Sequence, residues 1–67
     1  MSVAKVIEII SSSKKSFEDA ASTGVAKAAE SLHEITGAWI KDQSVKVVKG
    51  KVVEFRVTMK LTFVLDN

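Results

Sequence analysis

The sequence predicts an α+β fold of β-α-β-β order, with a three-stranded antiparallel sheet and one helix across one face of it. Large apolar and polar residues alternate from Val53 to Leu65, which is typical of a long strand with one buried face. Apolar residues recur with a helical period from Lys15 to Ile35, and a run rich in β-branched residues precedes them. Together these three patterns give the types and the order of the elements.

The first strand is expected over the β-branched run from Val3 to Ile10. Side chains alternate between the two faces of a strand, so Ile7 and Ile9 share one face and Glu8 lies on the other. The three serines that follow, Ser11–Ser13, are interpreted as a polar break between this strand and the helix.

The helix is expected from Lys15 to Ile35. Ser16, with Asp19 three residues later, resembles a capping box at its start. One stripe of the helix carries its apolar residues, which are Phe17, Ala20, Ala21, Val25, Ala28, Leu32 and Ile35. Gly24 interrupts this segment at a cost of about 1 kcal/mol relative to alanine. A close approach of the helix to the sheet, or to a neighbouring chain, would explain that glycine. Gly37 is expected to end the helix.

Two further strands, Ala38–Val48 and Val52–Leu65, are expected to form a hairpin. Lys49 and Gly50 mark its turn, and a two-residue loop would pair Val48 with the residue after the glycine. The last strand has fourteen residues and would span about 46 Å at about 3.3 Å per residue. A helix of about twenty residues covers about 30 Å, so part of the apolar face of this strand needs cover from another subunit.

The hairpin register predicts which side chains share a face of the sheet. It places Trp39 opposite Lys60, and Gln43 opposite Arg56. Directly paired residues lie on the same face, so all four are expected on the face opposite the helix.

The size and composition of the chain favour an oligomer. A single domain over residues 1–67 buries only about 60% of the surface of its unfolded chain. Disulfides, a structural metal or oligomerisation usually stabilise such small domains. The chain has no cysteine, and His33 is its single histidine. Disulfides, thiolate metal sites and multi-histidine sites within one chain are thereby excluded, and oligomerisation remains.

The charge balance gives no support for a nucleic-acid partner, because ten Lys and Arg residues face eight Asp and Glu residues. No signal-peptide pattern and no apolar stretch of about 20 residues is visible. We therefore expect a soluble, cytoplasmic protein without a membrane partner. No set of nucleophile, base and orienting residue can be named, so the sequence argues against an enzyme.

Trp39 is the candidate centre of a binding site. Tryptophan often anchors a subunit interface, and its flat ring also stacks on flat aromatic ligands. In a symmetric oligomer the two roles merge, because two copies of Trp39 across a twofold axis make one aromatic slot. Arg56 and Gln43 could bind the polar edge of a ring, and an ordinary solvated polar face is the competing interpretation.

Three segments together resemble the dodecin family over nearly the whole chain: VAKVIEII-SSSKKSFEDA, GAWIKDQ and EFRVTMKLTFVLD. The resemblance implies a sheet that wraps partly around the helix, and twelve protomers that form a hollow homododecamer built from trimers. It also implies that flavins, riboflavin or FMN, are bound in stacked pairs between tryptophans and are stored without turnover.

This sequence departs from the pattern of the family at the implied site. The usual stacking tryptophan aligns with Gly37, and Trp39 lies two residues later on the same face. Arg56 stands where many members have a glutamine that binds the flavin edge. Arginines that assist nucleotide phosphates in some members align with Ser44 and Val64.

Two function hypotheses follow from the resemblance. In the first, the protein stores flavin, with Trp39, Arg56, Gln43 and Gly37 in the site. In the second, it keeps the dodecin-type shell and binds coenzyme A or a cation instead, or serves only as a scaffold.

Overall fold

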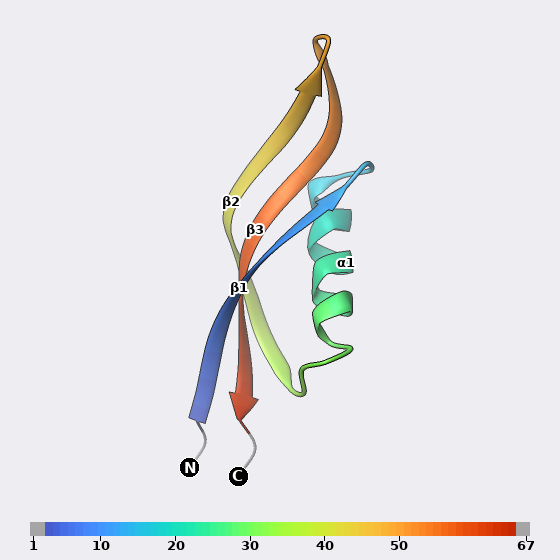
Figure 1. Ribbon diagram of the computed structural model, residues 1–67. Helices are drawn as coiled ribbons and strands as arrows, with labels where there is room; N and C mark the ends of the chain where they lie inside the picture. Colours follow the sequence, from blue (N-terminus) through green and yellow to red (C-terminus); the bar gives the residue numbers. More distant parts are fainter. Residues whose placement is uncertain (1–2, 66–67) are drawn as a thin grey trace.

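The computed structural model describes residues 3–65 and has the expected β-α-β-β order (Figure 1). The other four residues of the domain expected over residues 1–67 lie outside the described part. Strand β1 spans Val3–Ser13 and helix α1 spans Phe17–Ala28; strands β2 and β3 span Ile35–Val48 and Lys51–Leu65. The strands form one antiparallel sheet in the order β1-β3-β2, which confirms the predicted fold class.

Helix α1 lies along one face of the sheet, which we call the helix face (Figure 1). No helix or strand of residues 3–65 covers the opposite face, which we call the outer face (Figure 1). The joined ends of β2 and β3 extend beyond the helix at the top of Figure 1. The molecule is accordingly elongated, with extents of 52 × 19 × 13 Å.

The core is small and is built mainly by β3, the central strand. Its buried apolar residues are Ala20, Val57, Met59, Leu61 and Phe63. Four of these five occupy alternate positions of β3, as the alternation in the sequence predicted. Phe17 of α1 meets Phe55 edge to face, with ring centroids 5.1 Å apart and an interplanar angle of 78°.

Strand β1 continues through the three serines, so the polar break expected at Ser11–Ser13 was wrong. The Ser11 hydroxyl donates to the Ala20 carbonyl oxygen at 2.7 Å, and the Ser13 hydroxyl donates to Asp19 Oδ2 at 2.6 Å. Small hydroxyl side chains thus fasten the end of β1 to the first turns of the helix.

The helix begins as expected and ends earlier. Ser16 Oγ accepts a hydrogen bond from the Asp19 backbone N–H at 2.9 Å, which confirms the N-cap. The expected end at Ile35 was wrong, because the helix stops at Ala28 and Ile35 already pairs with Phe63 in the sheet. Gly37 does not end the helix; it lies in β2 opposite Thr62.

Gly24 is buried where α1 crosses the sheet closely, which confirms the first of the two explanations, a close approach of the helix to the sheet. A Cβ atom at this position would lie 2.8 Å from Met59 Cε and 2.8 Å from Ser11 Cβ. The glycine is therefore needed for the spacing between α1 and the sheet.

The hairpin register agrees with the prediction beside the turn and again from Gly37 to Ile40, and it differs between these two stretches. Lys49 and Gly50 both have positive φ, 52° and 77°, and Val48 pairs with Lys51 as expected. An irregularity between Lys46 and Val47 then leaves Val53 of β3 without a partner.

A second irregularity, between Ile40 and Asp42, inserts Lys41 into β2 and restores the predicted register. Trp39 therefore pairs with Lys60, as predicted. Between the two irregularities Gln43 pairs with Val57, so the prediction that Gln43 lies opposite Arg56 was wrong.

Candidate functional site

Three residues form a row across the outer face. Glu8 of β1 and Trp39 of β2 both pair with Lys60 of the central strand β3. Paired residues in an antiparallel sheet share a face, and the neighbours of Lys60 along β3, Met59 and Leu61, are buried under the helix. The row therefore lies on the outer face, as the sequence predicted for Trp39.

Trp39 is the candidate binding platform, and 51% of its surface is exposed. Gly37 lies two residues before it on the same face and carries no side chain. A Cβ atom at Gly37 would meet no atom within 4 Å. The indole is thus bordered by open backbone, which leaves room for a flat ligand that extends past the ring.

Lys60 supplies the charge nearest to the indole. Its Nζ lies 5.7 Å from the centroid of the Trp39 ring, within the range of a cation–π contact. On the other side of Lys60, Glu8 Oε1 accepts a hydrogen bond from Lys41 Nζ at 3.3 Å and forms an ion pair with it. Lys41 is the residue inserted into β2 by the irregularity, and its side chain reaches across β3 to β1.

Arg56 lies on the outer face and is separated from the row. It pairs with Ser44 and Ser12, four residues before Lys60 in β3, which corresponds to about 13 Å along the strand. Its Nη2 contacts Glu54 Oε2 at 2.7 Å. The guanidinium group is half-exposed and is held by a carboxylate of its own strand.

Gln43 is not brought together with the other predicted site residues. Its partner Val57 is completely buried on the helix face, so Gln43 belongs to that face. The structure thus gathers Trp39, Gly37 and Lys60, places Arg56 farther along the same face, and turns Gln43 away. The contact between Lys60 and the indole was not deduced from the sequence, although the predicted pairing with Trp39 was a sufficient signal.

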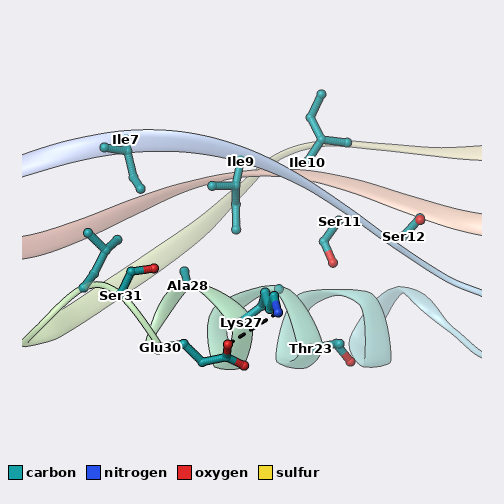
Figure 2. A pocket seen from close by; sticks show the side chains of 12 residues that line it. Ile7, Ile9, Ile10, Ser11, Ser12, Thr23, Lys27, Ala28, Glu30 and Ser31 are labelled. Atoms are coloured by element: carbon teal, nitrogen blue, oxygen red, sulfur yellow. Dashed lines mark hydrogen bonds and ion pairs between the residues drawn. The ribbon is translucent and has the colours of Figure 1, made fainter.

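A groove lies elsewhere, between β1 and α1 on the helix face (Figure 2). Ile7, Ile9 and Ser11 point toward the helix in this view, whereas Ile10 points away. An exposed ion pair between Lys27 and Glu30, 3.4 Å long, lies on the helix side of the groove. The groove is open and largely apolar, and its polar groups do not converge on a single point, so we regard it as a contact surface.

Residues 3–65 contain no cluster of three or more His, Cys, Asp or Glu side chains that could hold a metal ion. Over the same residues no helix is long and apolar enough to cross a membrane. The cytoplasmic location and the lack of enzymatic activity expected from the sequence stay predictions.

The fold and the site define a small β-α-β-β protein with an open, aromatic sheet face and much uncovered apolar surface. The chain belongs to the dodecin family, whose model it matches over residues 3–66. It is similar to calcium dodecin of Mycobacterium tuberculosis, with 35% identity over 63 residues, which cover 94% of this chain and 89% of the relative.

Solved dodecin structures have the same fold. A mutant of T. thermophilus dodecin superposes with a TM-score of 0.94 at 22% identity, over 100% of both chains. Dodecin from Streptomyces davaonensis gives 0.94 at 24% identity, over 98% of this chain and 97% of its own. The crystal structure of calcium dodecin from Mycobacterium tuberculosis is described as calcium chelating, with a novel calcium-binding site. It superposes with a TM-score of 0.84 at 34% identity, over 96% of this chain and 91% of its own.

Proposed function

We propose that this protein binds and stores a flavin, riboflavin or FMN, on its outer face. The observation that carries the proposal is the half-exposed indole of Trp39 beside the bare backbone of Gly37, on a face that α1 leaves open. A flat aromatic ring stacks favourably on such a surface, since aromatic pairs are worth about 0.5–1.5 kcal/mol beyond the area that they bury.

Within this proposal each residue has a distinct role. Trp39 stacks on the isoalloxazine ring, and Gly37 leaves room for the part of the ring that extends past the indole. Arg56 lies about 13 Å from Lys60 along β3 and offers N–H donors to a polar group at that end of the ligand. Gln43 lies on the helix face and is left out of the proposed site.

The proposal includes assembly, because the described chain leaves much apolar surface uncovered. Its exposed large apolar residues are Val3, Val6, Ile10, Trp39, Ile40, Val45, Val47, Val48, Val52, Val53 and Leu65. Five of these valines lie near the tip of the β2–β3 hairpin, which extends past the helix (Figure 1). Uncovered apolar surface of this extent favours contacts with further copies. We propose the twelve-subunit shell, built from trimers, that the family resemblance implies.

The assembly is tested by light scattering coupled to size-exclusion chromatography. The expected mass is about twelve times the chain mass of 7.3 kDa. Each subunit covers apolar surface of its neighbours, so unfolding should also shift to higher temperature as protein concentration rises. A folded species with the mass of one chain would contradict the proposal.

Titration of the purified protein into riboflavin and into FMN, followed by flavin fluorescence, tests the binding function. Stacking on tryptophan is expected to quench the fluorescence to a saturable end point. A protein of large mass that leaves the fluorescence of both flavins unchanged would contradict flavin storage.

Calcium binding is the second candidate function, and the 35% identical relative named calcium dodecin favours it. Residues 3–65 do not gather three His, Cys, Asp or Glu side chains at one point, so this candidate draws the remaining oxygen ligands from backbone carbonyls, water or a second copy. Calorimetric titration of the same sample with Ca²⁺ separates the two candidates. Saturable heat with Ca²⁺ and no flavin quenching would favour a cation-binding shell over flavin storage.

A further inference from the structure

The position of Lys60 makes it part of the Trp39 surface. It is the central residue of the row across the outer face, with Glu8 on one side and Trp39 on the other. Lys60 is only partly exposed, whereas the indole is half-exposed. Its ammonium group lies over the indole ring, at 5.7 Å from the ring centroid. In the absence of ligand the lysine therefore occupies the surface on which a flat ligand would stack.

The carboxylate opposite Lys60 is engaged elsewhere. Glu8 pairs with Lys41 at 3.3 Å, and farther along the face Glu54 pairs with Arg56 at 2.7 Å. Asp42, opposite Thr58, is the next paired residue of β2 on the outer face after Trp39. Among residues 3–65 no carboxylate oxygen comes within 4.0 Å of Lys60 Nζ. The positive charge of Lys60 is thus directed at the indole and has no ion-pair partner there.

A ligand that stacks on this side of Trp39 must displace the ammonium group. A neutral ring breaks the cation–π contact and offers no charge in exchange. A flat ligand with an anionic group on a flexible substituent breaks the same contact and gives Lys60 an ion-pair partner. The flexible four-carbon stem allows the ammonium group to follow such a group without movement of the strand.

We propose that Lys60 is a specificity-determining residue of the Trp39 site, and that it selects flat ligands with negative charge over neutral ones. The proposal rests on the proposed flavin function. Of the two flavins it assigns FMN, with its phosphate, as the preferred ligand and riboflavin as the weaker one.

The test compares the dissociation constants of FMN and riboflavin in wild-type protein and in Lys60→Met. The variant is expected to bind FMN about threefold more weakly, because the ion pair is lost, and riboflavin about threefold more tightly, because the indole is free. The preference for FMN should therefore fall by about tenfold. Lys60→Arg keeps the charge and is expected to keep the preference.

Lys27→Met is the matched control, since it removes one positive charge from the exposed side of α1 and leaves the outer face unchanged. It should leave the ratio of the two constants at the wild-type value. An unchanged ratio in Lys60→Met, with both flavins still bound, would overturn the role of Lys60 and leave flavin storage intact. Absence of binding by wild-type protein would overturn both. If Lys60→Met fails to fold, Lys60→Gln takes its place with the same expected shift.

Discussion

Replacement of Trp39 by alanine is expected to weaken flavin binding by about 30-fold or more, which corresponds to about 2 kcal/mol. The indole is half-exposed on the open face, so its truncation removes the stacking surface without opening a cavity in the core. In the proposed symmetric assembly each slot loses two indoles from one substitution. Fluorescence titration with riboflavin measures the loss.

Two further variants separate stacking from general loss of apolar surface. Trp39→Phe keeps a smaller flat ring and should lose less affinity than Trp39→Ala. Val53→Ala removes an apolar side chain that is 41% exposed near the tip of the hairpin, seven residues before Lys60 in β3, and should leave flavin affinity nearly unchanged. Wild-type affinity in Trp39→Ala, in an assembly of normal mass, would remove Trp39 from the proposed site.

Gly24→Ala is expected to lower the free energy of unfolding by about 1–3 kcal/mol, the usual cost of overpacking a close contact. Helix propensity alone would raise the free energy of unfolding by about 1 kcal/mol. The sign of the measured change therefore shows whether the steric cost or the helix propensity is the larger effect. Met59 Cε can swing away from the new methyl group, but Ser11 Cβ is fixed to the backbone of β1. We therefore expect the steric cost to exceed the propensity gain.

Chemical denaturation at constant protein concentration measures this effect, since assembly contributes to the apparent stability. Gly37→Ala is the matched control, because its Cβ would meet no atom within 4 Å. With no steric cost, it should raise the free energy of unfolding by up to about 1 kcal/mol, the usual gain when a glycine inside a strand becomes alanine. A Gly24→Ala variant more stable than wild type would show that helix and sheet are farther apart than the structure places them.

The sequence was sufficient for the order of the elements and for the long central strand. The alternation along β3 is nearly unbroken, and Ser16 is a clear N-cap signal, so both were predicted correctly. The end of α1 was missed because no glycine or proline marks it. Leu32 and Ile35 continue the helical period, yet pairing of Ile35 with Phe63 in the sheet prevails over that local pattern.

The irregularities in the hairpin could not be predicted, and one of them decides the position of Gln43. Near the turn both strands carry consecutive valines, Val47–Val48 and Val52–Val53, so the alternation that fixes a register is lost there. Because neighbouring residues in such a run are all apolar, an extra residue does not disturb the apolar–polar alternation and cannot be detected from it. The pairing of Trp39 with Lys60 was correct because the second irregularity cancels the first.

The candidate site could be predicted only in part for a second reason. A single chain supplies one indole, and the proposed slot needs another from a symmetry-related copy. The sequence shows which surface is aromatic and uncovered. The distance between two copies of Trp39 depends on the assembly, which residue patterns within one chain do not encode.

A crystal structure of the wild-type protein with riboflavin bound is the most direct test of the account. We expect the isoalloxazine ring on the outer face, parallel to the indole of Trp39 at about 3.5–4.0 Å, with a second Trp39 from another copy closing the slot. A ring bound in the groove between β1 and α1, or any flavin site away from Trp39, would contradict it.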